Sequence, residues 1–165
     1  MKRILVIGLG NPILGDDGVG WRIADEISKW LLTTEDTVQD AVAVECVSLG
    51  GLSLMEHMIG YDNVILIDAL ESGLYPAGTI REFPLAELPD PSAGHSTSTH
   101  DTTLLNALNT GKIMGIALPS IITVLAVETL NCYEFSENLS PPISAAIPAT
   151  VDHVKAILSA MLYEE

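Results

Sequence analysis

The sequence predicts a single α/β domain of three layers, in which a mostly parallel, twisted sheet of about five strands carries helices on both faces. Short apolar runs alternate with segments of helical periodicity, and Gly, Pro, Asn and Asp separate them. The length of 165 residues suits one domain, large enough to bury about 70% of the surface of the unfolded chain. We therefore expect residues 1–165 to form one unit without an internal linker.

The strands of this sheet are expected at the short apolar runs, each of which is bounded by turn-forming residues. The expected strands are Arg3 to Ile7, Val42 to Val47, Asn63 to Ile67, Thr79 to Phe83 and Ser120 to Val127.

Between these runs, apolar residues recur with the spacing of a helix. The first helix is expected from about Asp17 to Leu32, where apolar residues recur every three or four positions. Asp16 or Asp17 would then lie at its positively polarised N-terminus. Further helices are expected after residues 50–51 and after His100–Asp101, and a last helix, entered near Pro148, closes the chain.

This order of elements brings distant acidic residues together. With right-handed crossovers the first and third strands lie side by side, and the second lies outside the first. A crevice then opens at the carboxyl ends of the first and third strands. The loop after the first strand carries Asp16 and Asp17, and the third strand leads into Asp68. We expect these carboxylates to converge.

Composition excludes several classes of partner. The formal charge is −15, from 7 Lys and Arg against 22 Asp and Glu, so phosphate backbones are repelled and no nucleic-acid partner is expected. The apolar run that ends before Gly8 is too short for a signal peptide, and no stretch reaches the roughly eighteen apolar residues of a membrane span. With only Cys46 and Cys132 as cysteines, a reducing, cytoplasmic location is expected.

Residues 8–20, GLGNPILGDDGVG, begin like a phosphate-binding loop but end in carboxylates. Gly8 and Gly10 match the first two glycines of the dinucleotide fingerprint, whereas Ile13 occupies the third position. Asp16 and Asp17 would place negative charge where the phosphate should lie. The loop therefore favours a cation over an anion. For Asp68 two interpretations stand equally, a cation ligand or the cap of the following turn.

One of the four histidines is placed to join these carboxylates. His57 and His153 fall in expected helices, where surface or packing roles are typical, and His95 lies in the polar loop 89–99. His100 directly precedes Asp101, a plausible N-cap, which would fix it at the carboxyl edge of the sheet. Two carboxylates and an imidazole suit zinc, nickel or cadmium and leave positions open for a substrate group. The motifs of serine hydrolases and of helical zinc peptidases are absent.

These motifs together resemble those of the nickel-iron hydrogenase maturation endopeptidases. Gly8 to Pro12 followed by Gly15 to Gly20 resembles their amino-terminal motif, and Val64 to Ala69 resembles their second acidic motif. Similar segments follow in order at 77–79, 98–101 and 139–142, so the likeness covers nearly the whole chain. One departure is the stretch 47–52, where the family often carries a Gly-Thr turn.

The resemblance implies a phosphorylase/hydrolase-like fold and a specific activity. The family removes a carboxyl-terminal extension from the nickel-loaded precursor of the hydrogenase large subunit, and the nickel belongs to the substrate. The positions that contact the metal and carry catalysis fall on Asp17, Asp68 and His100. Cadmium or zinc would suit the same donors, no organic cofactor is implied, and the free protein is expected to be a monomer.

Two alternatives stand beside this interpretation. Peptidyl-tRNA hydrolases share the opening Gly-Leu-Gly-Asn-Pro, but they need a cationic surface and an Arg-His-Asn segment that this chain lacks. A non-catalytic nickel-binding or chaperone module would use the same carboxylates and histidine without cleaving a bond, and the sequence does not discriminate against it.

Overall fold

The computed structural model describes residues 2–87, 99–130, 132 and 134–163, and for residues 99–103 it describes only the backbone. Five strands form one sheet in the order β2-β1-β3-β5-β4. The three pairs β2–β1, β1–β3 and β3–β5 are parallel, and the edge strand β4 runs antiparallel to β5. Their bounds are β1 Ile4–Leu9, β2 Val42–Val47, β3 Asn63–Leu70, β4 Ile80–Pro84 and β5 Ile121–Glu128.

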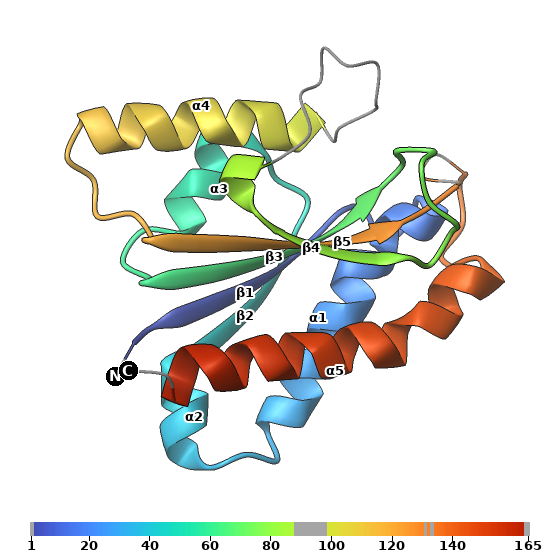
Figure 1. Cartoon of the computed structure of the whole chain (residues 1–165), viewed down its shortest axis with the longest axis horizontal. Helices are drawn as coiled ribbons and strands as arrows, with labels where there is room; N and C mark the ends of the chain where they lie inside the picture. Colours follow the sequence, from blue (N-terminus) through green and yellow to red (C-terminus); the bar gives the residue numbers. More distant parts are fainter. Residues whose placement is uncertain (1, 88–98, 131, 133, 164–165) are drawn as a thin grey trace.

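Helices cover both faces of the sheet, which confirms the predicted three-layer α/β class (Figure 1). One face carries α1 (Val19–Leu31), α2 (Asp36–Ala41) and α5 (Pro141–Tyr163), and the other carries α3 (Gly51–His57) and α4 (Thr99–Ile113). Two short 3-10 turns, η1 (Gly15–Gly18) and η2 (Leu85–Glu87), complete the described elements.

The core has two halves because the central strands are buried on both sides. In β1, Ile4 and Val6 pack with α1 and α5, whereas Leu5 and Ile7 pack with α3 and α4. Strands buried on both faces read as continuous apolar runs in the sequence. This is why the runs predicted the strands to within a few residues.

The order of the first three strands is confirmed. Ile4 of β1 is in register with Val42 of β2 and with Asn63 of β3. The strand β3 continues to Leu70, three residues beyond the expected end. Asp68 therefore lies within the strand, where it pairs in register with Ala126 of β5.

Two helix predictions need correction, and one helix was not predicted. The last helix begins at Pro141 and not near Pro148, because prolines are tolerated in a first helical turn, where the missing N–H has no partner in any case. The helix α4 begins at Thr99, so Asp101 lies inside it and is not its N-cap. The short helix α2 was not expected from the apolar periodicity.

The composition of the helix α5 bears on the expectation about membrane spans. Among the described residues it is the helix that is long and apolar enough to cross a bilayer by length and composition. Asp152 and Lys155 interrupt its apolar residues, so it contains no unbroken apolar run of the expected length of about eighteen residues. Core helices of globular domains meet the same criterion, and Val154 and Leu158 of α5 pack in the core with α1.

Candidate active site at the carboxyl edge of the sheet

The start of α1 lies directly against the carboxyl ends of β1 and β3. A Cβ atom at Gly20 would collide with the carbonyl oxygens of Leu9 and Ile67, so the helix approaches as closely as only glycine allows. The turn η1 precedes this contact and itself touches β3. Asp16 and Asp17, both in η1, are thereby brought to the edge of the sheet.

A glycine turn also fixes the position of Asp17. Gly10 has a φ of 120°, and a Cβ atom there would collide with the backbone oxygen of Asp17. The loop after β1 can therefore fold back onto η1. Oδ2 of Asp17 accepts a hydrogen bond of 2.6 Å from the Asn11 N–H, which orients the half-buried carboxylate.

Asp68 is buried in β3, with 7% of its surface exposed. Its Oδ1 accepts a hydrogen bond of 2.8 Å from the N–H of Ala69. Its neighbours at alternate positions, Leu66 and Leu70, belong to the half of the core beneath α3 and α4. Because side chains alternate along a strand, Asp68 shares that face with α4.

The turn η1, which carries Asp17, touches β3, which carries Asp68, and the thiol of Cys132 lies within range of both charges. Burial raises the pKa of this thiol, the hydrogen bond between Thr129 and Cys132 lowers it, and the charges of Asp17, Glu71 and Asp68 raise it further, to about 12. Negative charges in the surroundings of a thiol disfavour its ionised form, so they raise its pKa. Neither Cys132 nor Glu71 was expected at the site, because both lie in irregular segments without a periodic signal.

Asp16 has a structural partner that the sequence did not reveal. It is 1% exposed, and its two carboxylate oxygens accept hydrogen bonds from the Ser140 N–H at 2.7 Å and the Ser140 hydroxyl at 2.8 Å. Ser140 immediately precedes α5, whose first two residues are prolines without N–H donors. The expectation that Asp16 caps α1 is therefore wrong: no side chain caps that helix, and the charge of Asp16 lies at the N-terminus of α5.

The segment before α5 lies along the acidic loop. The Gly15 N–H donates to the Ser136 carbonyl at 2.7 Å, and the Ser136 N–H donates to the Ile13 carbonyl at 3.1 Å. The guanidinium of Arg22 donates to the Glu137 carbonyl at 2.9 Å. These bonds hold residues 134–140 against the loop that carries Asp17.

A buried glutamate shapes the loop after β3. Glu128 is fully buried at the end of β5 and accepts hydrogen bonds from the Ser72 N–H and hydroxyl and from the Gly73 N–H, at 2.8 to 3.0 Å. Three donors, of which the Ser72 hydroxyl is shared between the two oxygens, satisfy a charge that would otherwise be costly to bury. This role was not predictable from the sequence pattern, because Glu128 simply ends an apolar strand.

The histidines divide as the sequence suggested, as far as they are described. His57 and His153 lie at the surface, each 2.6 Å from a glutamate, Glu45 and Glu82 respectively. His100 falls in the first turn of α4, but its side chain and the whole of His95 lie outside the described residues. Within the described part of the chain, no three His, Cys, Asp or Glu side chains are arranged to hold a metal ion.

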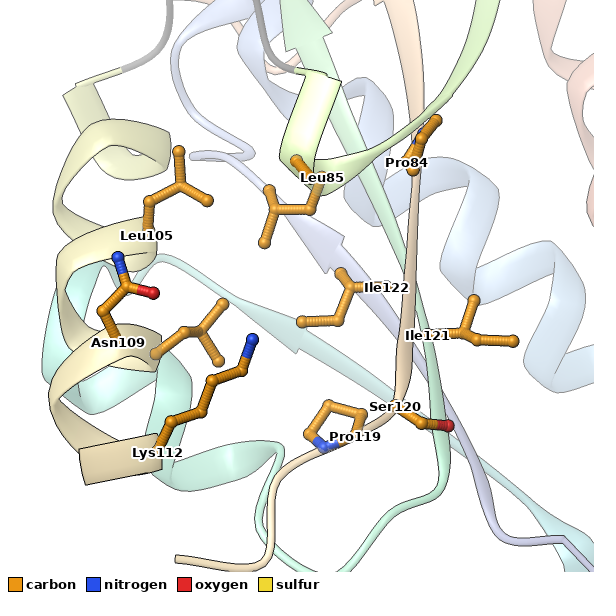
Figure 2. Close-up of a pocket in the computed structure, with 11 residues that line it drawn as sticks. Pro84, Leu85, Leu105, Asn109, Lys112, Pro119, Ser120, Ile121 and Ile122 are labelled. Carbon is orange, nitrogen blue, oxygen red and sulfur yellow. The ribbon is translucent and has the colours of Figure 1, made fainter. Parts of the chain in front are cut away.

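A separate pocket of about 280 Å³ lies between α4 and the edge of the sheet (Figure 2). Its walls are mostly apolar, and Lys112 and Asn109 reach it from the C-terminal half of α4. It is also lined by Ile121, at the amino end of β5. It includes neither Asp17 nor Asp68, so it is distinct from the site at the carboxyl edge.

Known proteins with similar sequences match most of this chain, and their names all refer to hydrogenases. A family model described as hydrogenase maturation protease matches residues 32–157. The hydrogenase expression/formation protein HupD of Rhizobium leguminosarum is 28% identical over 157 residues, which cover 94% of this chain and 74% of that protein. The hydrogenase 2 maturation protease of Escherichia coli is 28% identical over 158 residues, covering 94% of this chain and 90% of that protein.

A solved structure shares the architecture. The hydrogenase maturating endopeptidase HybD from Escherichia coli has a TM-score of 0.77 and 26% sequence identity, with 96% of this chain and 93% of that chain covered. The five-stranded sheet and its helices therefore match the fold of this group of endopeptidases.

Proposed function

The chain belongs to the hydrogenase maturation protease family, and from this premise we propose that it removes a carboxyl-terminal extension from the nickel-loaded precursor of a nickel-iron hydrogenase large subunit. The observation that carries the proposal is the contact of η1, which carries Asp17, with β3, which carries Asp68, at the carboxyl edge of the sheet. This edge is where parallel α/β sheets bind their ligands.

We assign the recognition of the precursor's nickel to Asp17, Asp68 and His100. The nickel is part of the substrate, held there before the protease binds. Two carboxylates and an imidazole are ordinary ligands for such an ion, and they leave other positions to the ligands that the precursor supplies. Zinc or cadmium would suit the same donors. Cleavage would then depend on metal loading, because an empty precursor lacks the group that these side chains recognise.

The carboxylates also suit the hydrolytic step. One of them would accept a proton from the attacking water while the water oxygen bonds to the scissile carbonyl carbon. The C–N bond then breaks, and the same proton passes to the departing amine. Hydrogen bonds from the N–H groups of Asn11 and Ala69 hold one oxygen of Asp17 and one of Asp68 in place. Fixed orientation of this kind is what general-base catalysis requires.

The proposed partner is a protein, and the proposed location is the cytoplasm. The net charge of −15 favours a protein partner over a nucleic acid. We place the reaction in the cytoplasm, with the free protease as a monomer that needs no cofactor of its own. Membership in a protease family favours a peptidase over a nickel chaperone or a peptidyl-tRNA hydrolase.

The direct test is an incubation with the cognate precursor. The purified protein is mixed with precursor prepared with and without nickel, and the products are weighed by mass spectrometry. We expect loss of a carboxyl-terminal peptide only from the loaded precursor. If the loaded precursor stays intact, the proposed activity is wrong; if the unloaded precursor is cleaved equally well, the role of nickel is wrong.

A further inference from the structure

Large apolar side chains are exposed on the loops that surround the proposed active site. They follow three neighbouring strands, β1, β3 and β5, whose parallel carboxyl ends share one edge of the sheet. Their exposed fractions run from 41% for Ile13 to 82% for Phe135. We call this group the apolar rim, and its members are Ile13, Leu74, Tyr75, Leu130 and Phe135.

Hydrogen bonds tie the members of the apolar rim together in two places. Ile13 and Phe135 are neighbours because the Ser136 N–H donates to the Ile13 carbonyl, and Leu14 and Ser136 form an isolated β-bridge. On the other side, Glu128 holds Ser72 and Gly73, which lead into Leu74 and Tyr75.

The same side holds Leu130 close by. The Thr129 N–H donates to the Leu70 carbonyl at 2.8 Å, so the chain leaving β5 stays beside the chain leaving β3. The loops that carry the apolar rim are therefore held by hydrogen bonds between backbone groups and by those to the Glu128 carboxylate. Exposed apolar groups on an ordered scaffold are typical of surfaces that bind another protein.

We propose that the apolar rim is the docking surface for the folded large-subunit precursor, which it seats with the cleavage junction against Asp17 and Asp68. This inference rests on the proposed function. The apolar rim is continuous with the loop that carries Asp17 and with the segment that leaves β3 two residues after Asp68, so a protein substrate that reaches both carboxylates covers it. Burial of these side chains would supply binding energy at a distance from the scissile bond.

Charge identifies the chemistry of the partner surface. Glu134 and Glu137 are exposed beside Phe135, and Glu71 lies at the start of the loop that carries Leu74. The complementary surface is therefore apolar with basic side chains around it. A second copy of this chain fits poorly, because each copy carries a formal charge of −15.

The test compares apolar-to-serine variants at the two ends of the sheet. Phe135→Ser and Leu74→Ser alter the apolar rim, and Ile113→Ser is the matched control, because Ile113 is 87% exposed at the far end of α4. Affinity for the loaded precursor is measured by biolayer interferometry, and processing by the rate of peptide release. All variants are checked by circular dichroism.

We expect each rim variant to raise Kd and KM for the precursor about tenfold, with kcat unchanged, the effect of losing one anchoring side chain at an interface. The control should stay within about twofold of the wild type. Rim variants that bind and process like the wild type would overturn the proposal. So would sedimentation showing a wild-type dimer that Phe135→Ser dissociates, because the rim would then serve a second copy.

The binding arm separates this inference from the proposed function. If the wild type binds the precursor through the apolar rim but releases no peptide, the docking surface stands and the proposed activity fails. If the wild type cleaves the precursor while the rim variants match it in both assays, the activity stands and the docking surface is wrong.

Discussion

Asp16 and Ser140 are joined by two hydrogen bonds, from the Ser140 N–H at 2.7 Å and from its hydroxyl at 2.8 Å, across 124 residues of sequence. The pair binds the loop after β1 to the start of α5. Its neighbour Asp17 is half-buried and lies with Asp68 near Cys132. Two adjacent carboxylates thus have different surroundings: Asp16 joins two distant segments of the chain, and Asp17, which accepts a hydrogen bond from the Asn11 N–H, is the one that we propose for chemistry.

Asp16→Ala is expected to lower the free energy of unfolding by about 2–3 kcal/mol, because it removes a charge-assisted pair of hydrogen bonds and leaves the half-buried Ser140 N–H without its acceptor. Urea denaturation monitored by circular dichroism measures the change. Asp25→Ala, on the exposed face of α1, is the control and should change stability by less than about 0.5 kcal/mol. Equal stability of the Asp16 variant and the wild type would show that the pair contributes nothing.

Asp17→Asn, Asp68→Asn and His100→Ala are each expected to lower kcat for precursor processing by at least about 100-fold while the fold is retained, because each removes a proposed nickel contact or the general base. Mass spectrometry of timed reactions gives the rates, and Asp152→Asn, on the exposed face of α5, serves as the control. Asp16→Ala should affect processing less than Asp17→Asn at a temperature where both are folded. Full activity in any one of the three variants removes that residue from the site.

The fold was largely predictable because its signals are local. The strands β1, β2 and β3 are buried apolar runs, and the crossover rule placed β1 beside β3 without any knowledge of contacts. The same rule brought Asp17 and Asp68 to one edge. The errors lie at boundaries, such as the start of α5 at Pro141, where propensity alone does not decide between a loop and a first turn.

The partners of the site residues were not predictable because they depend on contacts between distant segments. Nothing near Asp16 in the sequence indicates that its carboxylate oxygens accept hydrogen bonds from Ser140. The position of Asp16 just before a helix instead favoured a place at the N-terminus of α1. Cys132 and Glu128 likewise acquire their surroundings only from the packing of loops. Local patterns in a single sequence do not report contacts between segments that are far apart in the chain.

Cys132 is expected to make stability fall between about pH 9 and pH 12. Burial and the nearby carboxylates raise the pKa of the folded thiol to about 12, from 9.0 for an unperturbed thiol. In this interval the unfolded chain has released the proton and the folded chain retains it, so rising pH favours unfolding. Cys132→Ser, which keeps a hydroxyl beside Thr129, should reduce this slope in urea titrations.

The comparison is made in a Cys46→Ser background, because burial also raises the pKa of Cys46. A second variant tests the cause: Asp17→Asn removes a negative charge and should lower the pKa of Cys132. Identical pH slopes with and without the Cys132 thiol would contradict the expected shift.

Gly20→Ala is expected to destabilise the protein by more than about 2 kcal/mol, because the new methyl group would collide with the carbonyl oxygens of Leu9 and Ile67 and push α1 away from the sheet edge. Gly73→Ala is the control: its φ is +69°, but nothing lies within 4 Å of the added atom, so only the backbone strain of about 1–2 kcal/mol applies. The two free energies of unfolding are compared by urea denaturation. Because Asp17 lies three residues before Gly20, the collision should also lower processing in molecules that remain folded. A Gly20 variant as stable and as active as the wild type would show that the close approach of α1 is not required to place Asp17.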